Sequence, residues 1–234
     1  MNIVGHRGIA GHYPENTRVS IEAAIELGLN WIEVDIQPSK DDVLVVCHDH
    51  TVDRCSNGKG RVDTLTLSEL RQLNFAHRYP ECSPQTILTL SELLDIANRH
   101  RIKLNLEVKI DHHDPEHVVD LLARTLKGIE LPTEVILFSS FNHDVVRQLR
   151  KQFPTHAIAV LSERLRRKDR LLLEEVQAVG CNLNHLWTSK RQISSLQKLG
   201  YKVWCYTVNN PNRLKRLSNL DGIFSDYPER FLTP

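Results

Sequence analysis

Two short segments place acidic side chains at every second position among apolar ones. Glu33 and Asp35 alternate with isoleucine and valine in WIEVDIQ at 31–37, and Glu107 alternates with leucine and valine in LNLEV at 104–108. Side chains of a strand alternate between its two faces, so the acids of each segment share a face. A surface strand with alternating charge is the alternative interpretation, which the repeat on a second segment disfavours.

Carboxylates held close together repel one another, and a bound cation removes that repulsion. Carboxylate oxygens completed by water suit the hard cations Mg²⁺ or Ca²⁺, whereas zinc more often takes histidine or cysteine. The pattern therefore predicts that Glu33, Asp35 and Glu107 hold one divalent cation, Mg²⁺ or Ca²⁺.

Histidine and basic side chains directly follow the apolar segments around these acids. His6 and Arg7 follow the first such segment, His48 follows VLVVC, and Lys109 follows the segment of Glu107. Cleavage of a phosphodiester needs a base, an acid for the departing alkoxide, and positive charge against the phosphate. We therefore predict that His6 and His48 form an acid–base pair, and that Arg7 and Lys109 contact phosphate oxygens.

Short apolar segments alternate with amphipathic ones along the whole chain, which predicts parallel strands joined by helices. A doubly wound open sheet shows the same alternation, but the number and length of the strands favour a closed TIM (β/α)8 barrel. A single domain over 1–234 is expected, with a first helix over 17–27 capped by Asn16. The eight expected strands are 2–5, 31–37, 102–108, 134–138, 157–161, 181–184, 202–208 and 222–225.

A polar stretch interrupts this alternation after the second strand. The apolar run at 43–47 is followed by turn signals at Asn57-Gly58 and Lys59-Gly60, and by a short helix near Leu67. A capping box at Thr89-x-x-Glu92 announces a further helix over 91–99. The stretch is therefore expected to be an insertion.

Composition excludes several classes of protein. Thirty basic and twenty-nine acidic residues leave a net charge of +1, which predicts no nucleic-acid partner, and the basic stretch at 164–170 is taken as a solvated helix start. The sequence shows no secretory signal and no apolar run of about 18 residues, so we expect a cytoplasmic protein without stable membrane insertion. The five scattered cysteines indicate reduced thiols. The sequence leaves the oligomeric state open.

With these residues placed, the sequence resembles the glycerophosphodiester phosphodiesterase family along nearly the whole chain. The shared motifs are GHRG at 5–8, PENT at 14–17, IEVDIQ at 32–37, HD at 48–49 with a following TVDR, LNLEVK at 104–109, SF at 140–141, YTVN at 206–209 and DGIFSDYP at 221–228. All of these motifs occur together, in the order and at spacings that the family allows, so the match is specific. The resemblance implies a TIM-type barrel with a small insertion at about 45–85.

The resemblance also implies roles that coincide with those expected from strand geometry. Glu33, Asp35 and Glu107 would be metal ligands, His6 and His48 the catalytic pair, and Arg7 and Lys109 phosphate contacts. Glu15 matches a family position near the site, where contact with substrate and helix capping are equally open. Tyr206 stands where many members carry tryptophan and keeps an aromatic wall. Leu88 and the segment 74–82 depart from the family pattern, which leaves the shape of the insertion open.

The implied activity is metal-dependent hydrolysis of a small glycerophosphodiester to sn-glycerol 3-phosphate and an alcohol. His48 is favoured as the acid and His6 as the base, while attack by water or by the glycerol 2-hydroxyl stays open. One alternative is a lysophospholipase-D-like enzyme, which needs an apolar entrance. A second alternative is an inactive barrel that only binds a phosphate ligand.

Overall fold

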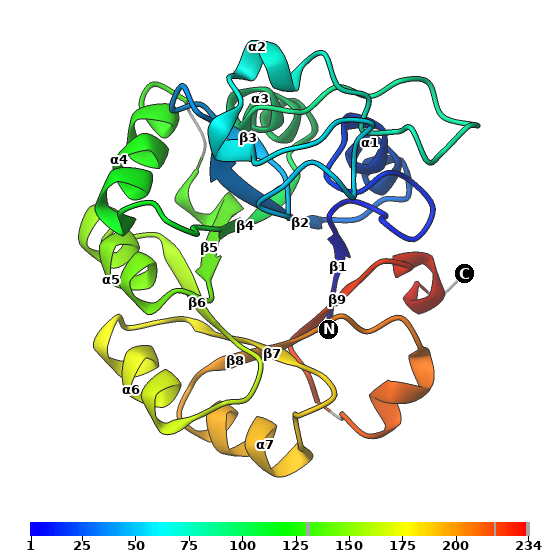
Figure 1. Cartoon of the computed structure of the whole chain (residues 1–234). Coiled ribbons are helices and arrows are strands. Elements are labelled where there is room, and N and C mark those ends of the chain that lie inside the picture. Colours follow the sequence, from blue (N-terminus) through cyan, green and yellow to red (C-terminus); the bar gives the residue numbers. More distant parts are fainter. Residues whose placement is uncertain (130–131, 218, 233–234) are drawn as a thin grey trace.

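Eight parallel strands close into a barrel in the computed structural model, which describes residues 1–129, 132–217 and 219–232 (Figure 1). The barrel closes because β1 pairs with both β2 and β9. The expected TIM barrel is therefore confirmed. Its strands are β1 (Asn2–His6), β2 (Trp31–Pro38), β4 (Lys103–Val108), β5 (Ile136–Ser140), β6 (Ala157–Ser162), β7 (Gly180–Asn184), β8 (Lys202–Tyr206) and β9 (Gly222–Ser225).

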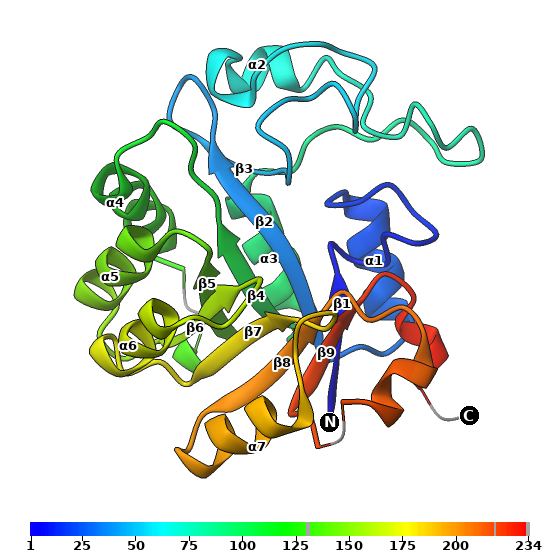
Figure 2. The same ribbon diagram turned by 60° about the horizontal axis from the view of Figure 1, so that its bottom comes forward.

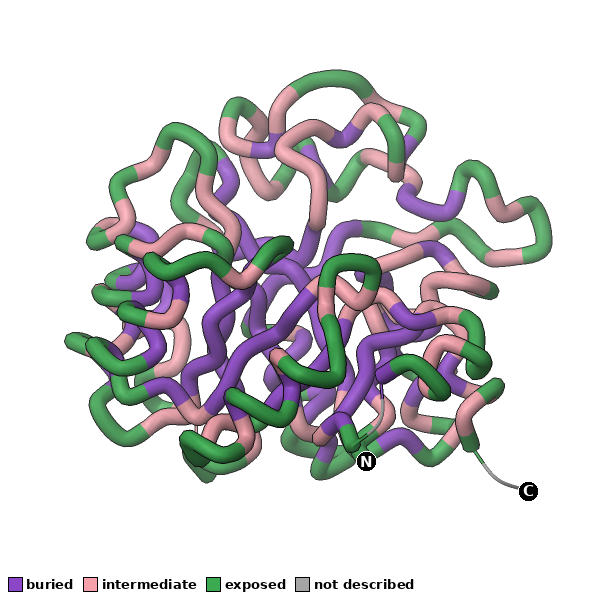
Figure 3. The backbone as a smooth tube through the Cα atoms, turned by 90° about the horizontal axis from the view of Figure 1, so that it is seen from below, coloured by how far each residue is buried: buried purple, intermediate pink, exposed green. Residues whose placement is uncertain are grey.

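Helices cover the outside of the barrel and bury the apolar face of its strands (Figures 1 and 2). On β2, for example, Ile32, Val34 and Ile36 have no exposed surface. Figure 3 shows the buried strands in the middle of the molecule and the exposed residues on loops and outer helix faces. The helices are α1 (Arg18–Glu26), α3 (Leu90–His100), α4 (Pro115–Leu126), α5 (His143–Gln152), α6 (Arg167–Glu175) and α7 (Lys190–Lys198), and a 3-10 helix, η3 (Pro211–Lys215), joins β8 to β9.

The interior of the barrel is divided into an apolar lower part and a polar mouth. Val4, Leu137, Ala159, Trp204 and Phe224 form one buried cluster inside the barrel. Val4 precedes His6 by two residues on β1, and side chains two residues apart share a face. The polar side chains therefore lie one layer nearer to the carboxyl ends of the strands, where the active sites of these barrels are built.

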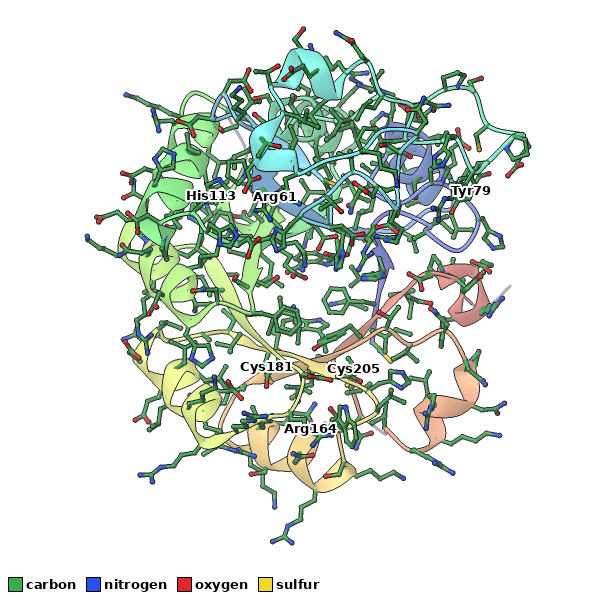
Figure 4. The ribbon with its side chains drawn as sticks, viewed as in Figure 1. Arg61, Tyr79, His113, Arg164, Cys181 and Cys205 are labelled. Atoms are coloured by element: carbon green, nitrogen blue, oxygen red, sulfur yellow. The ribbon has the colours of Figure 1, made fainter. Side chains whose placement is uncertain are left out.

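The insertion after β2 lies over one side of the barrel mouth (Figure 2). It begins with β3 (Leu44–Val46), which pairs antiparallel to β2, and continues through η1 (Val62–Thr64) and α2 (Leu67–Leu70). Two ion pairs tie it to the rim: Arg54 with Glu15 at 2.6 Å, and Arg61 with Asp111 at 2.9 Å. In Figure 4, Arg61 lies toward α4 and Tyr79 on the opposite side of the insertion. Its apolar residues form a small cluster of their own: Val45, Cys47, Val52, Val62, Leu70, Phe75 and Ile87.

Several predicted boundaries are wrong by a few residues. The N-cap of α1 is Thr17 and not Asn16, because the backbone of Asn16 is left-handed (φ 58°) and its side chain is used elsewhere. The strand expected at 134–138 starts at Ile136, since 133–135 form a 3-10 turn (η2), and β8 ends at Tyr206. The capping box of Thr89 and Glu92 is confirmed.

The other sequence expectations concern the thiols and the surface. All five cysteines are free, and Cys181 and Cys205, labelled in Figure 4, are among the buried ones. In the stretch at 164–170 most of the basic side chains are exposed at the start of α6. Among the described residues no helix has the length and apolar character needed to cross a bilayer.

Candidate active site

Three carboxylates meet at the mouth of the barrel on two neighbouring strands. Glu33 and Asp35 lie on β2, and Asp35 stands opposite Glu107 of β4 in the parallel register. One carboxylate oxygen from each lies within 4.8 Å of the others. All three residues are buried, with exposed fractions of 3%, 1% and 9%. The structure therefore brings together the three residues that the alternating pattern singled out.

Two cations lie against this cluster. Lys109 Nζ is 2.8 Å from Glu107 and 3.3 Å from Asp35, and Arg7 Nε is 3.3 Å from the other oxygen of Asp35. Arg7 reaches this position because the chain turns sharply after β1, with a left-handed backbone at Arg7 (φ 55°). Its own backbone N–H donates to Glu33 Oε2 at 3.1 Å.

Burial and mutual repulsion set the charge of the three acids. Burial, with Asp35 and Glu107 nearby, raises the pKa of Glu33 well above its usual value. Burial and Asp35 likewise raise the pKa of Glu107. Burial also opposes ionisation of Asp35, but Lys109 and Arg7 overcome it and lower the pKa of that carboxyl to about 2. The positive charges of Lys109 and Arg7 therefore do not fully offset the repulsion among the three carboxylates.

The donor set fits a hard divalent cation. Glu33 Oε1 and Asp35 Oδ1 are buried and accept no hydrogen bond from the described residues, although Lys109 lies 3.3 Å from the latter as an ion pair. Buried carboxylate oxygens without hydrogen bonds are costly unless a cation coordinates them. Three carboxylates with no cysteine or histidine among them match the oxygen ligands of Mg²⁺ or Ca²⁺.

Replacing Glu33 with glutamine should stabilise the protein when no divalent cation is bound. Because the pKa of Glu33 is raised in the folded state, the free energy of unfolding falls as the pH rises above the ordinary value of 4.5. At pH 8 the variant should therefore gain about 1–2 kcal/mol, or roughly 2–8 °C in Tm. Thermal unfolding in EDTA measures this.

The exposed Glu26 on α1 supplies a matched control, since Glu26→Gln should leave Tm within about one degree. Added Mg²⁺ should raise the Tm of the wild type more than that of Glu33→Gln. A Glu33→Gln variant that unfolds at a lower temperature than the wild type in EDTA would contradict the raised pKa.

Both predicted catalytic histidines lie beside this cluster, and each is held by an aspartate. His6 Nδ1 is 2.6 Å from Asp226, and its Nε2 is 3.8 Å from Glu33. His48 Nδ1 is 2.6 Å from Asp49. The side chain of His48 is 32% exposed and that of His6 16%, and burial lowers the pKa of His48. An aspartate bound to Nδ1 fixes the ring and directs Nε2 toward its reaction partner.

The two histidines line one pocket of about 350 Å³ in the barrel mouth. Arg7, Glu33 and Glu107 form its charged side, while Phe141, Leu161, Leu186, Tyr206 and Phe224 are among the residues of its other walls. Lys109 lines an adjoining hollow that shares Glu107 and Phe141 with the pocket. A larger hollow of about 650 Å³ beside α4 and α5 contains none of the predicted site residues, so we place the chemistry in the smaller pocket.

Glu15 has a different position from the other predicted site residues. Its carboxylate accepts hydrogen bonds from Arg7 at 2.9 Å and from Arg54 at 2.6 Å. Burial opposes its ionisation, but the hydrogen bonds and charges of Arg54 and Arg7 together outweigh burial and lower the pKa of Glu15. Because it lies behind Arg7 and not among the residues that line the pocket, Glu15 holds Arg7 in place.

Four further residues were not assigned to the site from the sequence, and Asn16 was expected to cap a helix instead. Asn16 donates to Asp35 at 2.9 Å, and Asp226 and Asp49 hold the histidines. Arg54 joins Asp49 to Glu15 and lowers the pKa of Asp49. Each of the four lies inside one of the motifs PENT, HD, TVDR and DGIFSDYP. The motifs therefore indicated that these residues matter, but not which side chains they contact.

The fold is a TIM barrel, and its charged pocket lies at the carboxyl ends of the strands, where enzymes with this fold have their active sites. Residues 6–230 match the model of the glycerophosphoryl diester phosphodiesterase family. The chain therefore belongs to this family and is a glycerophosphodiester phosphodiesterase, which replaces the alternative of an inactive binding barrel.

Similar proteins support this assignment over the full length. A glycerophosphodiester phosphodiesterase of Bacillus altitudinis is 31% identical over 97% of this chain and 95% of its own. One from Caldanaerobacter subterraneus subsp. tengcongensis is 30% identical over 98% and 96%. The structure of an Oleispira antarctica phosphodiesterase in complex with the product sn-glycerol-3-phosphate matches with a TM-score of 0.92 and 30% identity, covering 98% of this chain and 94% of that one.

Proposed function

We propose that this enzyme hydrolyses glycerophosphodiesters to sn-glycerol 3-phosphate and an alcohol, using a divalent cation and acid–base catalysis by His6 and His48. One observation carries the proposal: two histidines, each bound to an aspartate, line the same pocket as the carboxylate cluster. The product bound to the Oleispira antarctica phosphodiesterase supports the choice of substrate class. We also propose that residues 1–234 act as one catalytic domain.

The cation would be held by Glu33, Asp35 and Glu107 and would be Mg²⁺ or Ca²⁺. When bound, it supplies positive charge that polarises a phosphate oxygen and stabilises the charge that develops during cleavage. Its binding also neutralises the repulsion that raises the pKa values of Glu33 and Glu107.

The protein's own side chains perform the proton transfers. His6 Nε2 takes the proton of the attacking oxygen, and Asp226 stabilises the imidazolium that forms. His48, nearer to solvent and bound to Asp49, donates a proton to the departing alcohol oxygen. Arg7 and Lys109 contact the phosphate, where Arg7 can bind two oxygens at once and Lys109 acts as a point charge.

The proposal is tested by measuring release of sn-glycerol 3-phosphate from glycerophosphocholine, glycerophosphoethanolamine and glycerophosphoglycerol, with Mg²⁺ or Ca²⁺ added. We expect turnover of about 1–10³ s⁻¹ on at least one of them. Release of phosphocholine in place of choline would show that the other ester bond is cleaved and would overturn the proposed direction. Absence of turnover on all three substrates with either cation would overturn the proposed function.

A second candidate activity, on lysophospholipids, is favoured by the apolar rim of the pocket. Phe141, Leu186 and Trp187 are 47%, 57% and 49% exposed, and two of them line the pocket itself. Arg164, labelled in Figure 4 on the loop before α6, lies 3.6 Å over the ring of Trp187. An acyl chain could rest on this rim while the phosphate reaches the charged side. The rim supplies the apolar entrance that such an enzyme needs.

The choice between the two substrates is made by comparing kcat/KM for glycerophosphocholine and lysophosphatidylcholine. If the rim binds acyl chains, lysophosphatidylcholine should be the better substrate, and Leu186→Ser should lower its kcat/KM alone. A substitution that affects both substrates equally would remove this candidate.

A further inference from the structure

Asn182 and Tyr206 stand across the barrel from the carboxylate cluster. Around the closed sheet the strands follow the order β1, β2, β4, β5, β6, β7, β8, β9, so β7 lies opposite β2 and β8 opposite β4. Asn182 is on β7 and Tyr206 on β8, and both line the pocket that holds the two histidines. The pocket therefore has a charged wall and, facing it, a wall with neutral polar groups.

The polar atoms of these two residues have no hydrogen-bond partner among the described residues. Both atoms of the Asn182 amide and the hydroxyl of Tyr206 are buried and unpaired, and Asn182 has no exposed surface. Leaving such groups unpaired costs stability, so their presence in a pocket wall points to a ligand that pairs with them. Since both residues line the pocket, a ligand bound there lies beside these polar atoms.

The chemistry of this wall selects the kind of ligand group. An amide offers both a donor and an acceptor, and so does a phenol, whose pKa burial raises so that Tyr206 keeps its proton. The amide of Asn182 and the phenol of Tyr206 carry no charge that would attract phosphate. The cations that would attract it, Arg7 and Lys109, lie on the opposite wall beside the carboxylates. Hydroxyl groups, which donate and accept, are the matching partners.

We propose that Asn182 and Tyr206 form a subsite that recognises the hydroxyl groups of the glycerol moiety and selects glycerophosphodiesters over simple alkyl phosphodiesters. The inference rests on the proposed function and adds the residues that determine its specificity. The glycerol moiety is common to all the substrates and belongs in the closed part of the pocket. The variable alcohol leaves beside His48, the more exposed of the two histidines.

The test compares glycerophosphocholine with propyl phosphocholine, which lacks both hydroxyls, by measuring choline release from each. Tyr206→Phe removes one oxygen, and Asn182→Leu replaces the amide by an apolar group of similar shape. Each variant should lower kcat/KM for glycerophosphocholine by about 10–100-fold and change that for propyl phosphocholine by less than about threefold. Because neither side chain has a hydrogen bond to any residue that the structure describes, both variants should keep the wild-type Tm within a few degrees.

Leu161 gives a matched control, because it lines the same pocket and stands beside Asn182 in the sheet. Leu161→Ala should change kcat/KM for both substrates by similar factors. Equal losses on both substrates in Tyr206→Phe and Asn182→Leu would overturn the subsite.

A binding experiment keeps failure of the subsite distinct from failure of the proposed function. If the wild type fails to hydrolyse either one or both of the diesters, calorimetry with glycerol 3-phosphate and propyl phosphate in Mg²⁺ still tests the subsite. The wild type should bind glycerol 3-phosphate at least about tenfold more tightly, and both variants should lose that preference. Equal affinities in the wild type would overturn the inference.

Discussion

Replacing either His6 or His48 with alanine should lower kcat by about 10²–10⁴-fold while KM for a glycerophosphodiester changes by less than about threefold. In the proposed mechanism each imidazole moves a proton in the transition state, whereas Arg7, Lys109 and the cation account for most of the binding. The double variant should be little slower than the slower single variant, because residues that act as a unit show losses that do not add. Steady-state kinetics on purified variants measures both parameters.

His112 is a suitable control, since its side chain is 76% exposed on the loop after β4 and its ion pair is with Asp111 and not with a residue of the pocket. His112→Ala should keep kcat within about twofold. Near-normal kcat in His6→Ala and in His48→Ala, with both proteins folded, would refute the proposed acid–base pair.

Removal of divalent cations should reduce the rate to background, and the same cations should restore it. Glu33, Asp35 and Glu107 are buried within 4.8 Å of one another, so without a cation they repel the phosphate of the substrate as well as each other. After EDTA treatment and buffer exchange we expect a loss of at least about 10³-fold, reversed by Mg²⁺ or Ca²⁺. Titration of each cation into the stripped enzyme shows which of the two supports turnover.

Glu107→Gln is the informative variant for the cation, because Glu107 also contacts Lys109 and lies on the second strand of the cluster. It should raise the cation concentration needed for half-maximal activity by more than about tenfold. The matched control is Glu174→Gln, because Glu174 is exposed on α6. Full activity after exhaustive EDTA treatment, with no cation detected by elemental analysis, would mean that the carboxylates serve another purpose.

The sequence predicted the charged half of the site because that half follows from strand periodicity. Glu33, Asp35 and Glu107 share one face of two strands, and closure of the barrel brings neighbouring strands together. His6 and Lys109 were predicted because they directly follow apolar segments of the sequence; in the structure His6 is the last residue of β1 and Lys109 follows β4. Local pattern and position were sufficient for these residues.

The remaining half depends on contacts between residues far apart in the chain. Asp226 lies 220 residues from His6, and no local pattern specifies that they meet. Asn16 matches a helix cap in the sequence, yet a left-handed turn sends its amide to Asp35. Asn182 appears in the sequence as an ordinary polar residue of a strand, and only the closed barrel shows that it is buried without a hydrogen-bond partner in the described part of the chain.

His48 is not carried by the barrel itself, because it follows β3 at the start of the insertion. The insertion has a small apolar cluster that is separate from the main core, and Arg54 and Arg61 anchor it to the rim through surface ion pairs. Segments with few buried contacts open at lower free energy than the core. The segment around His48, however, is joined to the barrel itself, since Gln37 of β2 donates to the carbonyl oxygens of Cys47 and Asp49 on either side of it. The distance between the two catalytic imidazoles therefore depends on these contacts between the insertion and the barrel.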